Sequence, residues 1–296
     1  MSSNVTPDDF PEIRWNGHWI WAPEEPIFPA ENLISGARPQ MLEAHALFRK
    51  KFNLTQVPRR VPARMTADSR YVFFVNEREV YRGPIRSQPG RMYYDFFDLA
   101  PYLHTGENVL AVYVKYYGRP NSFWMPATPN LTLGRTGILV FEADLGAQGW
   151  LVSDGSWKAR KCEAWDGNWR EENDDPAGGG VPVEIFDARR FPAGWQAIEF
   201  DDAGWGSAQV VPAMHIGGFA DTQPPTDPYG PLYPRPIARV GGQVQLVRRE
   251  HHEKSYFPTR SAPVSGAGVS GGACRLPIES GRSKDGLSCG YQPAPH

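Results

Sequence analysis

The stretch ADSRYVFFVNEREVYRGP, residues 67–84, restricts the possible fold more than any other part of the chain. Aromatic and β-branched residues fill positions 71–75, where alternate side chains of a strand point to opposite faces. The polar residues at 76–79 predict a hairpin connection, and positions 80–81 begin the returning strand. Gly83 and Pro84 end that strand, because proline has no N–H for the ladder. The stretch therefore predicts antiparallel strand pairing.

The same kind of strand signal recurs along much of the chain. Short apolar or alternating runs, separated by Gly, Pro and Asp, lie at 46–54, 92–97, 108–117, 137–145, 150–153 and 157–161. No helical periodicity extends beyond two turns in the sequence. Many short strands with regular turn signals are typical of an all-β protein. We therefore expect an antiparallel β-sandwich with jelly-roll topology.

Composition argues against several functional classes. The formal net charge of −2 gives no electrostatic reason to expect a nucleic-acid partner. No run approaches the ~18 apolar residues of a membrane-spanning helix, so we expect no membrane association. The N-terminus lacks the basic and apolar segments of a signal peptide, and we therefore expect a cytoplasmic protein. The three cysteines are too irregularly spaced for a disulfide framework or a zinc site.

Changes in composition suggest four segments. Residues 1–12 are interpreted as a flexible leader, and residues 13–220 as the β-sandwich. Residues 221–240 are dense in proline and predict an extended linker or a clamp across a surface. Residues 241–296 are rich in Gly, Ser, Pro and Arg, with few apolar residues to offset the entropy of ordering. We expect a disordered tail there, and we interpret the abrupt change near residue 240 as a possible frameshift.

Three stretches together resemble a known family. ADSRYVFFVNEREVYRGPIRSQPGRMYYDFFDLAPYLHTGENVLAVYVKYYG, SDGSWKARKCEAW and VEIFDARRFPAGWQAIEFDDAGWGSAQVV resemble parts of the N-terminal jelly-roll module of bacterial α-L-rhamnosidases. The resemblance covers roughly residues 15–240 and implies a galactose-binding-like sandwich. Any one stretch alone is weak, because accessory sandwiches of β-galactosidase-like enzymes share similar patterns.

The resemblance also implies what this module lacks. In that glycoside hydrolase family the catalytic carboxylates lie in a downstream α-helical barrel, and no such helical repeat follows residue 240 here. An inverting glycosidase needs an acid and a base on either side of the scissile bond, and no such pair is singled out. We therefore assign no catalytic residue and expect a truncated, non-catalytic protein. The alternatives are a free-standing carbohydrate-binding module and a hydrolase with an unrecognised carboxylate pair.

The irregular stretch YYGRPNSFWMPATPN, residues 116–130, is the best candidate for a binding surface. Sugars stack their C–H faces on aromatic rings, and their hydroxyl groups need polar partners. Loops on a rigid sandwich commonly supply such groups. The candidate ligands for a rhamnose-containing glycan are Tyr116, Arg119, Asn121 and Trp124. The alternative is that these side chains pack against the catalytic domain that accompanies the module in its relatives.

Two further groups of residues have both a functional and a structural interpretation. Asp166, Glu171 and Asp174 offer the hard oxygen ligands that calcium takes, although their spacing matches no EF-hand and a solvated loop is the alternative. No other cofactor is expected. The Asp-x-x-Trp patterns and the EIFDAR run are interpreted as turns and ion pairs rather than as sugar or catalytic sites. The residues given this structural role are Trp157, Asp187, Arg189, Asp202 and Trp205.

Overall fold

The computed structural model describes residues 5–25, 43–87, 91–117, 137–167, 184–211, 222–225 and 231–237. The longer strands in these residues are β2 (Ala44–Leu54), β3 (Pro62–Asp68), β4 (Arg70–Val75), β5 (Arg78–Gly83), β6 (Met92–Asp98), β7 (Gly106–Tyr116), β8 (Ile138–Asp144) and β10 (Lys158–Lys161). The short strands are β1 (Ile20–Trp21), β9 (Trp150–Val152), β11 (Trp165–Asp166), β12 (Ile185–Phe186), β13 (Gly206–Ser207), β14 (Gln209–Val210) and β15 (Leu232–Pro234). The 3₁₀ turns within the described ranges are η1 (Pro7–Asp9), η2 (Ala100–Tyr102), η3 (Gly146–Gln148) and η5 (Ala188–Arg190).

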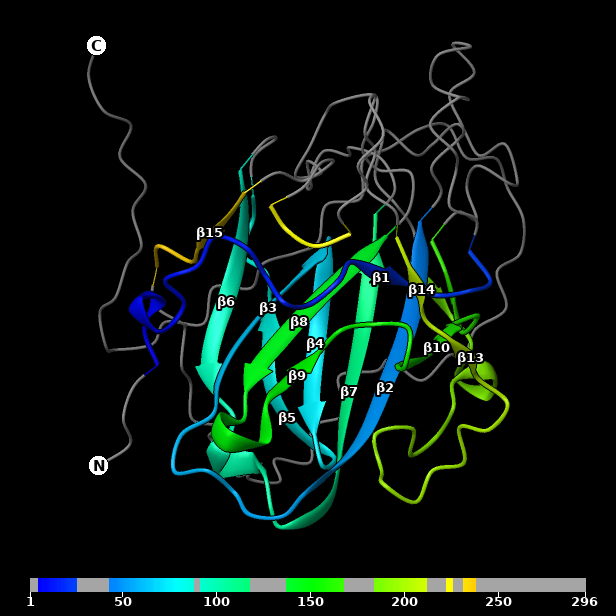
Figure 1. Cartoon of the computed structure of the whole chain (residues 1–296). Helices are drawn as coiled ribbons and strands as arrows, with labels where there is room; N and C mark the ends of the chain where they lie inside the picture. The colour runs from blue at the N-terminus through cyan, green and yellow to red at the C-terminus, as the bar shows by residue number, and fades with distance from the viewer. Residues whose placement is uncertain are drawn as a thin grey trace, which may run out of the picture. The chain divides into compact units, whose positions relative to one another are not determined.

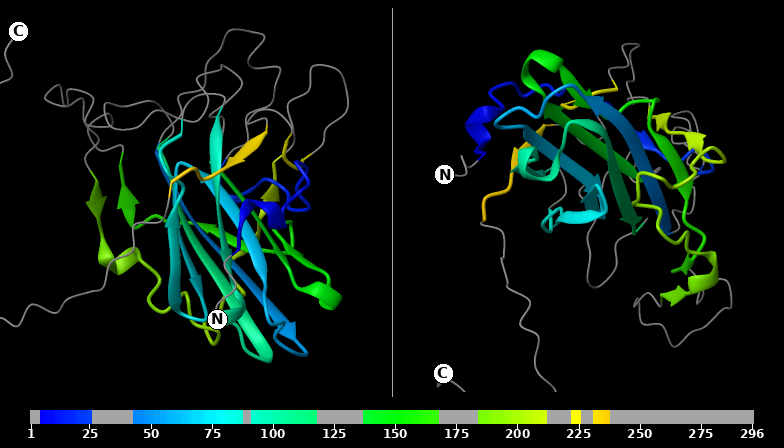
Figure 2. Two further views of the ribbon diagram at one scale, coloured as in Figure 1. Left: turned by 90° about the vertical axis from the view of Figure 1, so that its left-hand side faces the viewer. Right: turned by 90° about the horizontal axis from the view of Figure 1, so that it is seen from below.

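The strands form two facing sheets (Figure 1). Sheet A has the order β14-β1-β8-β3-β6-β15, with β9 paired to β8, and sheet B has the order β13-β10-β2-β7-β4-β5. Every pair is antiparallel except β15, which runs parallel to β6. The predicted all-β antiparallel sandwich is confirmed. A separate ribbon of β11 and β12 belongs to neither sheet, and both views of Figure 2 show it (green and yellow-green) projecting from the sandwich.

The predicted hairpin is present, with a tighter turn than the sequence suggested. β4 ends at Val75 and β5 begins at Arg78, so the connection is two residues long rather than four. Asn76 and Glu77 have φ angles of 48° and 67°, the left-handed pair that a type I′ turn requires. Such a turn matches the twist of the flanking strands, and Arg78 and Glu79 therefore join the returning strand.

The main core lies between the two sheets and is dominated by large rings. Phe48, Phe73, Phe141 and Trp157 are all completely buried there. The Phe141 ring meets the Phe73 ring at a centroid distance of 5.8 Å and the Trp157 ring at the same distance. Aromatic pairs in tilted or edge-to-face geometry add to the stabilisation from buried area.

A second, smaller core covers the outer face of sheet B. Leu47 of β2 and Ala111 of β7 point away from the main core and pack beneath Trp195 and Trp205. These tryptophan rings lie 6.4 Å apart and are stacked. The segment that follows β12 thus closes the outside of sheet B, and sheet B is buried on both faces along this part.

Two segments predicted to lie outside the sandwich contact it closely. Residues 5–12, expected to form a flexible leader, include η1, and the Asp9 carboxylate pairs with Arg60. Phe10 of this segment is only 8% exposed, because Arg64 and Tyr94 cover it. Within the predicted linker, Thr222 and Pro224 accept hydrogen bonds from the backbone of Trp19 and Trp15, and β15 extends sheet A. Backbone pairing, rather than composition, therefore decides where the sheet ends.

The chain divides between Val240 and Gly241 into two units, and every described residue lies in the first. In the parts of the chain that the structure describes, no helix is long and apolar enough to span a membrane.

Candidate functional site

Both Asp-x-x-Trp patterns form a turn that ends in a buried ring. Asp154 accepts the backbone N–H of Ser156 at 2.8 Å, and the Trp157 indole N–H donates to the Val152 carbonyl at 2.7 Å. Asp202 accepts the Trp205 backbone N–H through its own carbonyl at 2.9 Å, and Trp205 is 4% exposed. With both rings packed inside the protein, neither pattern presents an aromatic face to a ligand.

Asp202 has a second task, which the sequence pattern did not indicate. Its carboxylate lies 2.8 Å from Nε of Arg49, a β2 side chain with no exposed surface. The Arg49 guanidinium also donates to the carbonyls of Trp195 and Ala197 and lies over the Phe200 ring. Arg49 thus attaches residues 195–202 to sheet B. The sequence signal is a single arginine among the alternating residues of a strand.

Asp187 and Arg189 form a bidentate ion pair at the surface. Arg189 donates through Nε and Nη2 to the two Asp187 oxygens, both at 2.8 Å, and its backbone N–H also donates to this carboxylate. These hydrogen bonds lower the pKa of Asp187 to about 2. Glu184, in the same motif, turns instead to Lys115.

The predicted sugar-binding residues divide between described and undescribed parts of the chain. Tyr116 is 2% exposed and packs against the Trp21 ring in the main core. A binding role for the Tyr116 ring is therefore wrong, because strand alternation turns that side chain inward. Its neighbour Tyr117 lies on the other face, with Lys115 over its ring at 4.7 Å. Arg119, Asn121 and Trp124 lie outside the described residues, and their role stays a prediction.

The predicted calcium ligands are divided in the same way. Asp166 ends β11 and is partly exposed. Glu171 and Asp174 lie outside the described residues. Among the residues that the structure describes, no three His, Cys, Asp or Glu side chains gather as metal ligands. The calcium site therefore stays a prediction for a part of the chain that the structure does not describe.

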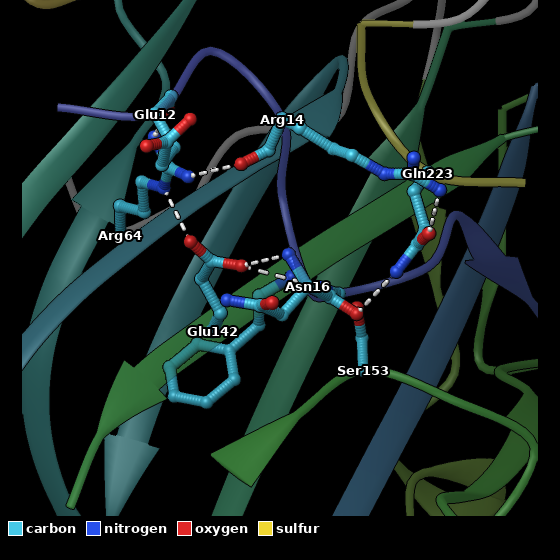
Figure 3. Close-up of polar contacts among 9 residues, drawn as sticks. Glu12, Arg14, Asn16, Arg64, Glu142, Ser153 and Gln223 are labelled. Carbon is cyan, nitrogen blue, oxygen red and sulfur yellow. Dashed lines mark hydrogen bonds and ion pairs between the residues drawn. The ribbon is translucent and has the colours of Figure 1, made fainter. Parts of the chain in front are cut away.

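Figure 3 shows a buried polar cluster on the outer face of sheet A. Arg64 of β3 and Glu142 of β8 lie opposite each other, and Nε of Arg64 is 2.6 Å from Oε1 of Glu142. The other Glu142 oxygen accepts the backbone N–H groups of Asn16 and Gly17. Arg64 also donates to the carbonyls of Glu12 and Arg14 and lies 4.2 Å from the Trp15 ring centroid. The cluster ties the N-terminal segment to the sheet.

A second buried carboxylate lies near β15. Asp95 of β6 is 1% exposed and accepts the Tyr71 hydroxyl at 2.7 Å. Arg235 follows β15 and lies 3.4 Å from Asp95, while it donates to the Tyr81 hydroxyl at 2.8 Å. Burial raises the pKa of the Tyr71 hydroxyl, which therefore stays protonated and donates. This cluster joins both sheets to the segment that the sequence interprets as a linker or clamp.

A third cluster lies on the outer face of sheet B, at the end of β7. His45 and Lys115 are cross-strand neighbours on β2 and β7. His45 Nδ1 lies 2.6 Å from the Tyr113 hydroxyl, and His45 Nε2 lies 2.9 Å from Oε1 of Glu43. The same Glu43 oxygen is 3.2 Å from Lys115 Nζ, which also pairs with Glu184. We call these five residues, Glu43, His45, Tyr113, Lys115 and Glu184, the outer-face cluster.

The environment of this cluster shifts the pKa of several members. Burial lowers the pKa of His45 and of Lys115 and raises the pKa of Tyr113. Burial also tends to raise the pKa of Glu43, but the hydrogen bonds and charges of His45 and Lys115 outweigh it and lower that pKa. His45 and Lys115 stand inside otherwise apolar strand sequences, and that interruption is the sequence signal for the cluster.

These clusters define what the described part of the chain can do chemically. Glu142, Asp95, Asp202 and Glu43 each pair with a cation from a neighbouring strand or segment. A carboxylate held in this way fixes geometry and is poorly placed to exchange protons with a substrate. Together with the two packed sheets, this arrangement defines a β-sandwich module in which buried ion pairs join strands and chain segments.

Comparison with known proteins identifies a family that this module resembles. Residues 85–226 match the family described as the alpha-L-rhamnosidase N-terminal domain. The resemblance inferred from the sequence motifs, to the N-terminal β-sandwich module of α-L-rhamnosidases, is therefore confirmed.

Individual relatives agree with the family match. The chain is 25% identical over 240 residues to an alpha-L-rhamnosidase of Streptomyces avermitilis. The aligned region covers 80% of this chain and 17% of that protein. The crystal structure of a GH78 family rhamnosidase of Bacillus sp. GL1 is similar with a TM-score of 0.57 and 29% identity, over 76% of this chain and 20% of that one. The structure of an alpha-L-rhamnosidase from Dictyoglomus thermophilum has a TM-score of 0.47 and 18% identity, over 74% of this chain and 22% of that one. The chain thus spans less than a quarter of each relative's length.

Proposed function

We propose that the β-sandwich is a non-catalytic accessory module that binds carbohydrate, with rhamnose-containing glycans as the ligand class. The observation that carries the proposal is the match of residues 85–226 to the N-terminal domain of α-L-rhamnosidases. Two of the relatives given above are named an alpha-L-rhamnosidase and a GH78 family rhamnosidase. A module found in such proteins is suited to hold or position the sugar chain.

The placement of the buried acids supports the non-catalytic part of the proposal. Glycoside hydrolysis needs one carboxyl group that can give up a proton and a second that meets the sugar or a water. One Glu142 oxygen pairs with Arg64 and the other accepts two backbone N–H groups, while the Asp202 carboxylate pairs with Arg49. Both acids serve the attachment of chain segments to the sheets, which is a structural task.

The residues that follow β7 in the sequence, from Tyr117 to Trp124, are the proposed binding surface. Tyr117 leaves the sheet on its outer face, and Arg119, Asn121 and Trp124 follow within seven residues in the sequence. Stacking on one or two rings and a few hydrogen bonds, offset by the entropy lost on association, suggest a dissociation constant on the order of millimolar. Trp124 would supply the stacking face.

Titration of the ¹⁵N-labelled chain with L-rhamnose and with a rhamnose-containing oligosaccharide tests the proposal. We expect saturable chemical-shift changes in the parent that are lost in Trp124→Ala. Trp150→Ala is the matched control, because Trp150 is 47% exposed on the opposite sheet and is expected to leave binding unchanged. Shifts that persist in Trp124→Ala would show that residues 117–124 are not the binding surface. An absence of any saturable shift would overturn carbohydrate binding itself.

A further inference from the structure

The ribbon of β11 and β12 meets sheet B through side chains rather than through a backbone ladder. Among the described residues, two cross-strand pairs join its strands, Trp165 with Phe186 and Asp166 with Ile185, and no ladder links it to sheet A or sheet B. An isolated two-stranded ribbon is marginally stable at best in water. Its position therefore depends on side chains that attach it to sheet B.

Trp165 packs against the smaller core on the outer face of sheet B, and the polar attachments converge on His45 and Lys115. The His45 ring stacks on the Trp165 ring at 5.7 Å with an interplanar angle of 14°. The backbone N–H of Cys162, just before the ribbon, donates to the His45 carbonyl at 2.7 Å. On the other strand, Glu184 pairs with Lys115 immediately before β12. Both strands of the ribbon thus begin or end at the outer-face cluster.

The neutral form of His45 satisfies both of its hydrogen bonds. A carboxylate can only accept, so Nε2 carries the proton that is donated to Glu43, and in the neutral ring Nδ1 accepts from the Tyr113 hydroxyl. A second proton on Nδ1 would face that hydroxyl and force its hydrogen to turn away. It would also place a second cation on the Glu43 oxygen that Lys115 already shares.

The surroundings of His45 set the direction of the effect. The charged and titratable groups that face the ring are Glu43, Tyr113, Lys115, Lys161, Cys162 and Glu184. Burial is the largest influence and lowers the pKa of His45, which Lys115 and Lys161 reinforce and Glu43 opposes. In the attached state His45 binds a proton less well than a solvated histidine, whose pKa is about 6.5. Acid therefore favours any state in which His45 is released.

We propose that His45 makes the attachment of the β11–β12 ribbon sensitive to pH, so that protonation of His45 in mildly acidic solution detaches the ribbon from sheet B. The detached state exposes Tyr113 and the thiol of Cys162, which is 3% exposed in the attached state. The remaining strands of sheet B stay paired, because the β2–β7 ladder runs the full length of both strands.

Cys162 supplies the readout. In the full chain with Cys274→Ser and Cys289→Ser, the rate of maleimide labelling is divided by the rate for the urea-unfolded chain at the same pH. We expect protection of Cys162 to be constant above about pH 6.5 and to fall below it, by at most about tenfold per pH unit because one proton is involved. In His45→Gln, which cannot become charged, the protection should no longer change with pH.

Two further variants keep the test decisive. His104→Gln removes an exposed histidine beyond the other end of β7 and should keep the parent's pH dependence. Tyr113→Phe removes the hydroxyl that stabilises neutral His45, which raises the pKa of attached His45 toward that of the released ring, so protection should fall less below about pH 6.5 than in the parent. If His45→Gln fails to fold, this smaller fall in Tyr113→Phe still decides the question. Protection that is independent of pH in the parent, or equally dependent in His45→Gln, would overturn the proposal.

Discussion

Arg64 and Glu142 form a buried ion pair in which each charge depends on the other for compensation. Both side chains are almost completely buried, with exposures of 4% and 0%. Removing one partner of a buried pair leaves the other charge without compensation, which typically costs about 3–5 kcal/mol. The sequence predicted a strand around Glu142 but none around Arg64, and it gave no indication that the two residues meet.

We expect Glu142→Leu to lower the free energy of unfolding by about 3–5 kcal/mol in a urea titration. The reason is that Arg64 loses its counter-charge and the Asn16 and Gly17 N–H groups lose their acceptor. Glu79→Gln is the control, because it breaks an exposed pair with Arg82 and should cost no more than about 1 kcal/mol. Equal losses in the two variants would show that the buried pair has no special weight.

The two buried tryptophans of the Asp-x-x-Trp turns should be important for stability. Trp157→Ala and Trp205→Ala should each destabilise the protein by about 3–5 kcal/mol, because each ring fills space that the surroundings cannot close. Trp150→Ala, at a largely exposed tryptophan, should change the stability by less than about 0.5 kcal/mol. A parent-like urea midpoint for either turn variant would contradict the anchoring role of that ring.

The surface pair of Asp187 and Arg189 predicts a pH effect of known sign. The pKa of Asp187 is lowered from 3.8 to about 2 by the hydrogen bonds from Arg189. The folded state therefore binds this proton less well than the unfolded chain, so the stabilisation is complete above about pH 4 and is lost as the pH falls toward about 2. NMR titration of the Asp187 carboxyl should show its pKa returning toward 3.8 in Arg189→Ala. A pKa that does not move in this variant would contradict the assigned cause.

At the scale of the element, the β4–β5 turn can be improved. Glu77 adopts a φ of 67°, a conformation that costs a side chain with a Cβ more than it costs glycine. Asn76 suits its own position, because its amide group bonds to Val109, Tyr102 and Asn108. Glu77→Gly should therefore raise the unfolding free energy by roughly 0.5–1 kcal/mol. A lower urea midpoint would show that the turn is not strained.

The sequence predicted most of the strands for a physical reason that also explains the exceptions. β2, β4, β7 and β8 are rich in aromatic and β-branched residues, and their alternation is visible in the sequence. β3 was missed, because its PARMTAD sequence places Arg64, Thr66 and Asp68 on a face that is covered by other parts of the chain. β15 was missed because proline density masks three residues that pair with β6.

The candidate site was less accessible from the sequence than the fold was. Local turns such as the one at Asp187 follow from neighbouring residues and could be inferred. The outer-face cluster joins His45 and Lys115 to Glu184, which are far apart in the sequence and meet only through strand register and the position of the ribbon. The inward direction of Tyr116 likewise depends on the register of β7 against β2.

At the scale of the whole molecule, the contacts at both ends of the sandwich predict how proteolysis will act. Arg60 and Arg64 hold residues 9–14, and Arg235 holds the segment that contains β15. The composition of residues 241–296 still predicts a disordered tail. Limited proteolysis should therefore leave a fragment from near residue 5 to near residue 240, because cleavage concentrates in unprotected backbone. A resistant fragment that retains the C-terminus would contradict this boundary.

We propose that the sandwich binds carbohydrate without cleaving it. One NMR experiment tests both binding and cleavage: the ¹⁵N-labelled chain is mixed with an aryl α-L-rhamnoside, and protein and ligand signals are followed for several hours. We expect saturable shifts of protein signals while the ligand signals keep their intensity. The appearance of free rhamnose, abolished by replacing a carboxylate within residues 15–240, would contradict it.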